Sequence, residues 1–217
     1  MSINIYFISG LGADRRAFNK LRFPPHFNKI YLDWIDANKN ESLESYAARL
    51  SINIDLKTPF YLVGLSFGGM LAVEIAKKLN PIHTFIISSI ITTTEIPSYF
   101  KIVGALRLQK LIPFTLLRNK RNLGLRFMGA KSADEKALLI QLIQSSDPSF
   151  IKWALTAILT WKNRERPLNM THFHGTSDFI LPIRFIKTAD IIIKNGGHFM
   201  VYANAKEMNE HITRLLS

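Results

Sequence analysis

A serine between glycines is the first group in this chain that could do chemistry. The segment Gly64-Leu65-Ser66-Phe67-Gly68-Gly69 follows an apolar run at 60–63 and precedes a helical pattern that begins at Met70. These patterns predict a strand, a sharp turn and a helix, with the serine on the turn. Only glycines can flank a serine on so sharp a turn without a clash, which is the arrangement of a nucleophile elbow. Glycine and serine also occupy ordinary turns, so Ser66 is a candidate nucleophile that needs partners.

The partners of a nucleophilic serine are a base and an acid, because its hydroxyl is a poor nucleophile at neutral pH. Among the six histidines, His198 follows the last predicted strand, on a loop where Gly196 and Gly197 let the chain turn back over the strand ends. Asp178 stands on a polar loop just past the preceding predicted strand. The order Ser66, Asp178, His198 is the one expected for this elbow. We therefore predict Ser66 as nucleophile, Asp178 as acid and His198 as base.

Other polar side chains offer weaker alternatives. Glu95 follows the fourth predicted strand and is an alternative acid, although it lacks the glycine-containing motif and the chain order of Asp178. His172 and His174 share one face of a predicted strand and could suggest a metal pair. The chain has no cysteine and no further ligand cluster, so no metal site is predicted. Three serines at strand ends are expected to be polar lining of the cleft: Ser9, Ser88 and Ser89.

The elements that must position these groups are short apolar strands alternating with amphipathic helices. This alternation predicts an α/β fold, a mostly parallel sheet with helices on both faces. The predicted strands are 5–9, 29–32, 60–64, 84–88, 170–173 and 189–194. Helices are predicted over 43–51 and 70–79, after Asp14, Ser132 and Asp147, and from 204 to the end.

The segment 92–166 carries only helical patterns, and we predict it to be an all-helical cap inserted within a single domain, 1–217. Its apolar residues Phe100, Trp153 and Trp161 are expected to shape a substrate pocket together with Leu106 and Phe114. The other interpretation of such residues is core packing.

The net charge of +12 raises the question of an anionic partner. Eight basic residues and no acidic ones lie between 101 and 131: Lys101, Arg107, Lys110, Arg118, Lys120, Arg121, Arg126 and Lys131. This segment could hold an anionic substrate such as a coenzyme A or carrier-bound thioester, or contact anionic lipid peripherally, and the alternative is a solvated face. No nucleic acid is expected, because the segment carries no known binding motif.

Several classes of protein are excluded or disfavoured by the composition. No run approaches the ~20 apolar residues of a membrane span. The first apolar run lacks a basic leader and a cleavage site, so it reads as a strand instead of a signal peptide. The absence of cysteine fits a cytoplasmic location.

Taken together, the motifs Gly-Leu-Ser-Phe-Gly-Gly at 64–69, His-Gly-Thr-Ser-Asp at 174–178 and Gly-Gly-His at 196–198 resemble those of the α/β-hydrolase superfamily. The resemblance implies an α/β-hydrolase fold of about six strands with a helical lid. It also implies an oxyanion hole made by the N–H groups of Leu11 and Phe67. Where the family commonly has His-Gly before the first donor, this chain has Ser9-Gly10.

The resulting expectation is a serine hydrolase that cleaves a small-molecule carboxylic ester or thioester through an acyl-enzyme. Neither a metal nor an organic cofactor is needed for that chemistry. The alternative is a catalytically idle protein of the same fold that binds a partner through the basic surface of the cap. Retention of the whole triad argues against the idle protein.

Overall fold

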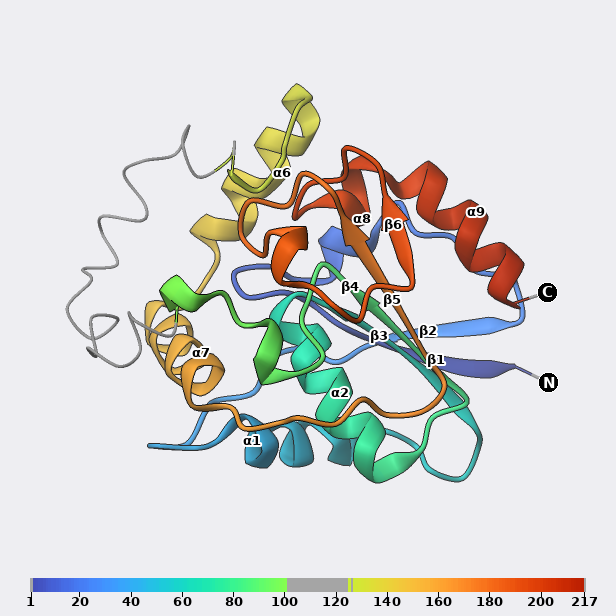
Figure 1. The fold of residues 1–217 in the computed structure, drawn as a ribbon. Coiled ribbons are helices and arrows are strands. Elements are labelled where there is room, and N and C mark those ends of the chain that lie inside the picture. The colour runs from blue at the N-terminus through green and yellow to red at the C-terminus, as the bar shows by residue number, and fades with distance from the viewer. Residues whose placement is uncertain (1, 101–124, 126, 217) are drawn as a thin grey trace.

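A six-stranded parallel sheet forms the centre of the protein in a computed structural model that describes residues 2–100, 125 and 127–216 (Figure 1). Every neighbouring pair of strands is parallel. The spatial order is β2 (Phe27–Tyr31), β1 (Ile3–Ile8), β3 (Phe60–Leu65), β4 (His83–Ile87), β5 (Met170–Gly175) and β6 (Ile191–Ile193). The predicted sheet of about six mostly parallel strands is confirmed.

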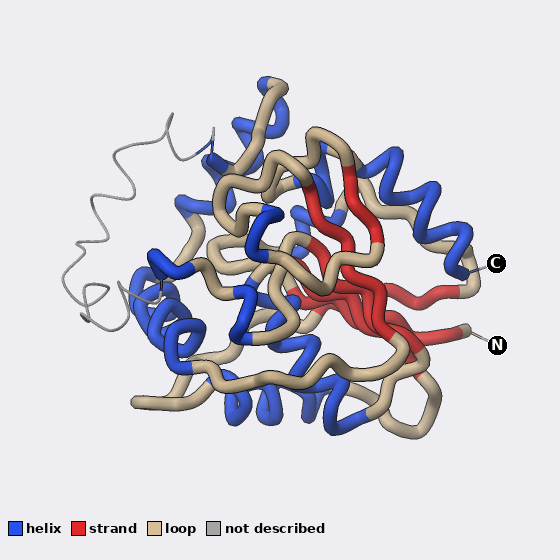
Figure 2. Tube along the Cα trace, viewed as in Figure 1, coloured by secondary structure: helices blue, strands red, loops and turns tan. Residues whose placement is uncertain are grey.

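Helices cover both faces of the sheet, as Figures 1 and 2 show. One face packs against α1 (Leu43–Leu50), α2 (Phe67–Leu79) and α7 (Pro148–Thr160). The other face packs against α6 (Ala133–Gln144), α8 (Met200–Ala203) and α9 (Ala205–Leu216). Burial on both faces explains why the central strands are continuous apolar runs instead of alternating ones.

Short 3-10 helices complete the described structure: η1 (Arg15–Phe18), η2 (Ser51–Asn53), η3 (Thr93–Glu95) and η5 (Ile183–Phe185). The helix predicted after Asp14 is the 3-10 helix η1, and the Asp14 carboxylate caps it by accepting the Arg16 N–H. None of the helices in the described ranges has the length and apolarity that crossing a membrane requires.

The start of α2 differs from the sequence prediction, because the helix begins at Phe67 instead of Met70. Gly68 and Gly69 lie in its first turn, although glycine is a poor helix former. A Cβ on Gly64 would stand 2.6 Å from the Gly68 carbonyl oxygen, so strand and helix touch at the backbone. Gly64 is therefore required by this contact, and Gly69 is required by another, because a Cβ on it would stand 2.6 Å from the Ser89 side chain.

The described part of the segment 92–166 contains helices and no strand. The predicted helix starts are confirmed: the Ser132 hydroxyl accepts the Glu135 N–H, and the Asp147 carboxylate accepts the Ser149 N–H. Leu106, Phe114 and all the basic residues of 101–131 except Lys131 lie outside the described residues. That the whole segment is a cap stays a prediction.

Candidate active site

Ser66 stands on the turn between β3 and α2 with a left-handed backbone, φ 51° and ψ −117°. A non-glycine residue with positive φ is strained, and such strain persists only where the surroundings enforce it. Here the Ser66 N–H donates to the Ile87 carbonyl of β4 at 2.8 Å. On the other side, a Cβ on Gly68 would lie 2.2 Å from the Ser9 carbonyl oxygen, so only glycine fits. These contacts hold the serine just beyond the carboxyl end of β3.

His198 lies between the serine and the acid predicted from the sequence. Its Nε2 is 2.9 Å from the Ser66 Oγ, and its Nδ1 is 2.8 Å from the Asp178 Oδ2. A carboxylate can only accept, so Nδ1 carries the proton and Nε2 is left to accept the serine O–H. His198 is 5% exposed and Asp178 is 3% exposed. The structure thus brings the three predicted residues into one buried hydrogen-bonded chain.

The Asp178 carboxylate is held ionised by its surroundings. Its Oδ1 accepts the N–H groups of Ile180 and Leu181 at 2.9 and 2.8 Å. Burial raises the pKa of this carboxyl, but the charge of His198 and the hydrogen bonds from His198 and Leu181 outweigh burial. The pKa of Asp178 therefore lies below its ordinary value of 3.8. An ionised acid at this place orients the imidazole of His198.

The loops of the acid and the base are joined at the backbone. The Ser177 N–H donates to the Gly196 carbonyl at 2.9 Å, and the Thr176 N–H donates to the Ile193 carbonyl at 3.1 Å. A Cβ on Gly175 would lie 2.2 Å from the Gly196 oxygen, so the two loops cross in contact. Asp178 and His198 are therefore carried by one small substructure at the β5–β6 edge of the sheet.

Glu95, the alternative acid, makes a different set of contacts. Its side chain is fully buried, and Oε1 accepts the N–H groups of Lys187 and Thr188 at 2.6 and 2.8 Å. Its Oε2 accepts the Ile91 N–H at 2.8 Å and the Thr188 hydroxyl at 3.2 Å. These bonds join the chain after β4 to the chain before β6. Backbone N–H groups donate to both oxygens of Glu95, so its carboxylate holds two segments of the chain together and is not placed to accept a hydrogen bond from His198.

His172 and His174 form a buried pair with separate hydrogen-bond partners. The Nδ1 of His172 lies 2.8 Å from the Thr188 hydroxyl, and the Nε2 of His174 donates to the Leu181 carbonyl at 2.8 Å. Burial lowers the pKa of His172 to about 3 and also lowers the pKa of His174, so both rings are neutral. Within the described residues, no three or more potential ligands are grouped to hold a metal ion.

A cavity of about 360 Å³ opens beside Ser66 and His198. Of the residues predicted to bind substrate or oxyanion, Leu11, Phe67 and Phe100 line it. Its polar side chains are those of Ser66, His198 and Ser89. The Ser89 hydroxyl already donates to the Ser66 carbonyl at 2.6 Å. The walls of the cavity are otherwise apolar.

The sequence reasoning did not single out Leu155 and Leu159, which belong to one wall of this cavity. They line it from α7 together with Ile158. Their spacing of three and four residues is itself a helical face, so the signal was present. Met128 also lines the cavity, and its carbonyl accepts the Phe199 N–H at 2.9 Å, but no sequence pattern marks it.

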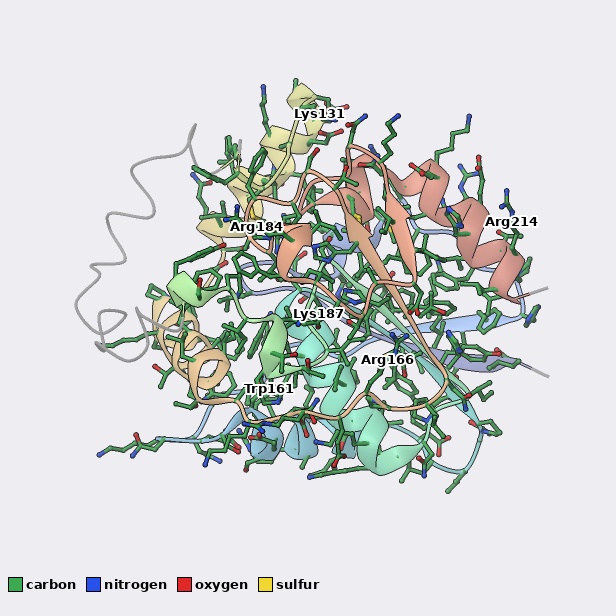
Figure 3. All side chains as sticks on the ribbon, viewed as in Figure 1. Lys131, Trp161, Arg166, Arg184, Lys187 and Arg214 are labelled. Carbon is green, nitrogen blue, oxygen red and sulfur yellow. The ribbon has the colours of Figure 1, made fainter. Side chains whose placement is uncertain are left out.

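Trp153 and Trp161 do not line the cavity, which corrects the prediction that they shape the substrate pocket. Trp161 directly follows α7 and is 4% exposed (Figure 3). Its Nε1–H donates to the Glu74 carboxylate at 2.8 Å. Trp153 donates its Nε1–H to the Glu41 carbonyl at 2.9 Å, with its ring 4.5 Å from that of Tyr46. A buried indole needs a partner for its N–H, and both find it on the α1–α2 side.

The loop after β1 lies against the serine. A Cβ on Gly10 would stand 3.3 Å from the Ser66 Cβ, and the Ala13 N–H closes a turn by donating to the Gly10 carbonyl at 3.0 Å. This turn carries Leu11. Phe67 is the first residue of α2, and N–H groups in the first turn of a helix have no intrahelical acceptor. The two predicted oxyanion donors thus come from the two backbone segments next to the serine, the turn after β1 and the start of α2.

The parallel sheet, the serine on the turn after β3 and the helices on both faces define an α/β hydrolase. A family model described as the alpha/beta hydrolase family matches residues 5–211. Because the match spans almost the whole sequence, this chain belongs to that family. No curated protein matches the chain significantly in sequence.

Several solved structures share the fold at low sequence identity. MenH from S. aureus is 16% identical, with a TM-score of 0.75 over 99% of this chain and 93% of that chain. A lipase-esterase related protein from Clostridium acetobutylicum ATCC 824 is 17% identical, with a TM-score of 0.72 over 97% and 93%. A bromoperoxidase from Bacillus anthracis is 16% identical, with a TM-score of 0.67 over 100% and 92%. At such identities the likeness establishes the fold alone.

Proposed function

We propose that this chain is a serine hydrolase that cleaves carboxylic esters or thioesters of small apolar acyl groups through an acyl-enzyme. The observation that carries the proposal is the unbroken hydrogen-bonded chain from the Ser66 Oγ through both nitrogens of His198 to Asp178, at 2.9 and 2.8 Å. That chain supplies a nucleophile, its base and the group that orients the base.

The first half of the reaction acylates the serine. The Ser66 Oγ attacks the carbonyl carbon of the substrate while His198 Nε2 takes the hydroxyl proton. The carbonyl oxygen becomes an oxyanion, which accepts the N–H groups of Leu11 and Phe67. When the tetrahedral intermediate collapses, the bond to the alcohol or thiol breaks, and the leaving group takes the proton from His198. Asp178 stabilises the imidazolium throughout and stays ionised.

The second half releases the acid. A water molecule gives its proton to His198 Nε2 and attacks the acyl carbon, which forms a second oxyanion in the same place. The bond to the Ser66 Oγ then breaks, and the serine takes back the proton. The products are a carboxylic acid and the alcohol or thiol, and the protein returns to its starting state.

The substrate class follows from the cavity. Its volume of about 360 Å³ is near the small end of ligand pockets, which hold roughly 300–1,000 Å³. No Asp, Glu, Lys or Arg side chain lines it among the described residues. Burying a charge without a partner is costly, so the acyl group is uncharged and apolar. The hypotheses of an anionic thioester carrier or an anionic lipid concern the basic segment 101–131, which lies almost wholly outside the described residues.

A serine-directed fluorophosphonate tests the proposal. Wild-type protein should be labelled once per chain, and Ser66→Ala should not be labelled while keeping the same melting temperature within a few degrees. If the folded wild type is not labelled, or Ser66→Ala is labelled equally, the proposed chemistry is wrong and the idle binding protein becomes the better hypothesis.

A panel of p-nitrophenyl esters and matched acyl-thioesters of increasing chain length tests the substrate class. We expect the highest kcat/KM for short neutral acyl groups, a steep fall for long chains that exceed the cavity, and little turnover of acyl groups with a terminal carboxylate. Equal turnover across the whole panel would contradict the assignment of the cavity as the acyl site.

A further inference from the structure

Trp34, in the loop after β2, contacts the loop that carries the first oxyanion donor. Its side chain is half-buried, and its Nε1–H donates to the Ala13 carbonyl at 3.1 Å. Ala13 ends the turn that begins at Gly10 and contains Leu11. The indole therefore holds the end of the turn whose middle presents the Leu11 N–H.

The same carbonyl has a second side-chain donor. The Ser9 hydroxyl, at the end of β1, donates to the Ala13 oxygen at 2.9 Å. A carbonyl oxygen has two lone pairs, so these two donors use its full capacity. The turn needs such restraint, because it contains Gly10 and Gly12, the latter at φ +74°, and glycines leave a backbone free to move.

The ring of Trp34 also reaches the second oxyanion donor residue. Its centroid lies 5.8 Å from that of Phe67 and 5.0 Å from that of Phe150 on α7. These distances are those of packed aromatic pairs. One indole thus hydrogen-bonds to the turn that carries Leu11 and packs on Phe67, the residue that begins α2.

We propose that Trp34 and Ser9 are positioning residues that fix the Leu11 N–H relative to the Phe67 N–H, so that both donors meet the oxyanion at once. The inference rests on the proposed function, since it concerns the oxyanion hole of that reaction. Preorganised donors stabilise a transition state because they do not have to reorient as charge develops. A donor that drifts by about 1 Å loses much of that effect.

Trp153 provides a matched comparison within the same protein. Its ring also packs on Phe67, with centroids 5.9 Å apart, and its Nε1–H also donates to a backbone carbonyl. That carbonyl belongs to Glu41, far from the turn with Leu11. The two tryptophans therefore differ in whether their N–H group restrains the oxyanion loop.

The experiment compares Trp34→Phe, Ser9→Ala and the double variant with Trp153→Phe as control, all on the best ester of the panel. Each phenylalanine keeps an aromatic ring and removes the N–H donor. We expect kcat to fall about tenfold in Trp34→Phe and in Ser9→Ala, with KM within about twofold of wild type. The double variant should lose more than either single variant, because the Ala13 carbonyl then has no side-chain donor.

A boronic acid inhibitor separates positioning from general packing. It forms a tetrahedral adduct with Ser66 and places an oxygen in the oxyanion hole, so its inhibition constant should rise in the same proportion as kcat falls. Ser9→Thr keeps a hydroxyl and should restore both values. If Trp34→Phe does not fold, Ser9→Ala and Ser9→Thr carry the test without it.

Three outcomes would overturn the inference. Unchanged kcat and boronic acid affinity in Ser9→Ala and Trp34→Phe would show that the donors do not position the hole, while the proposed hydrolase activity would stand. An equal loss in Trp153→Phe would assign the effect to packing around Phe67. A folded wild type that neither turns over esters nor reacts with the fluorophosphonate would overturn the proposed function, and this inference with it.

Discussion

Two buried carboxylates follow neighbouring strands of the sheet, and they are used in opposite ways. Asp178, after β5, gives one oxygen to backbone N–H groups and the other to His198. Glu95, after β4, gives its oxygens to the N–H groups of four residues and to one hydroxyl. Burial is similar in the two, so burial does not decide the role. The difference is the number of backbone N–H donors: they occupy one oxygen of Asp178, which leaves the other free to accept a hydrogen bond from His198, but they occupy both oxygens of Glu95.

The largest expected effect in this comparison is the loss of activity when Asp178 is substituted. Asp178→Asn should lower kcat by about 10⁴, because the amide favours the wrong tautomer of His198. The measurement is steady-state hydrolysis of the best ester, with circular dichroism to show that the variant is folded. A variant that keeps more than a tenth of wild-type kcat would return the role of acid to Glu95.

The corresponding change at Glu95 should affect stability. Glu95→Gln places an NH₂ group against backbone N–H donors and leaves some of them unpaired, which should cost about 3 kcal/mol in the free energy of unfolding. Chemical denaturation measures the loss, and kcat of the folded fraction should stay within about twofold. A large fall in kcat with unchanged stability would contradict the structural role.

A smaller loss is expected at Thr188, which connects Glu95 to His172. Its hydroxyl donates to the Glu95 carboxylate and lies 2.8 Å from the His172 Nδ1. Thr188→Val keeps the shape and leaves a buried ring nitrogen unpaired, so we expect a loss of about 1–2 kcal/mol in unfolding free energy. Thr188→Ser, which keeps the hydroxyl, should lose less than Thr188→Val. The opposite order would mean that packing, and not the hydrogen bonds, matters at this position.

The smallest expected effect is the pH dependence of the contribution that Asp178 makes to the free energy of unfolding. Because the pKa of this carboxyl is lowered in the folded protein, ionisation of Asp178 stabilises the fold above its unfolded pKa, ordinarily 3.8. This contribution is lost as the pH falls below that value and through the folded pKa. The difference in unfolding free energy between wild type and Asp178→Asn should therefore shrink as the pH falls below 4. A difference that grows in acid would contradict the lowered pKa.

The sequence predicts the sheet well because each central strand is an apolar run bounded by turn residues. Strand boundaries are less well predicted where tertiary contacts intervene. The last strand, expected over 189–194, is only Ile191–Ile193, and just before it the Asp190 carboxylate, instead of a backbone carbonyl, accepts the His172 N–H of β5. No local pattern reveals that contact.

The sequence predicts the three groups that the structure joins by hydrogen bonds, and it predicts their surroundings less well. Ser66, Asp178 and His198 stand in motifs whose glycines reflect backbone contacts, so spacing alone indicates them. The pocket is different, because α7 is apolar on two faces. The spacing of apolar residues in α7 therefore does not predict which face lines the cavity, as the face with Leu155 does, and which residues lie in the core, as Trp161 does. Trp34, in a polar stretch, has no periodic signal at all.

The crossing of the two loops at Gly175 and Gly196 has a consequence for dynamics. Asp178 follows β5 and His198 follows the short edge strand β6, whereas Ser66 follows β3, which β4 separates from β5. Local opening of the β5–β6 edge would release Asp178 and His198 together and leave the elbow intact. Amide hydrogen exchange at Ser177 would then report the fraction of molecules in which the hydrogen bonds of Ser66, His198 and Asp178 are lost before the protein unfolds.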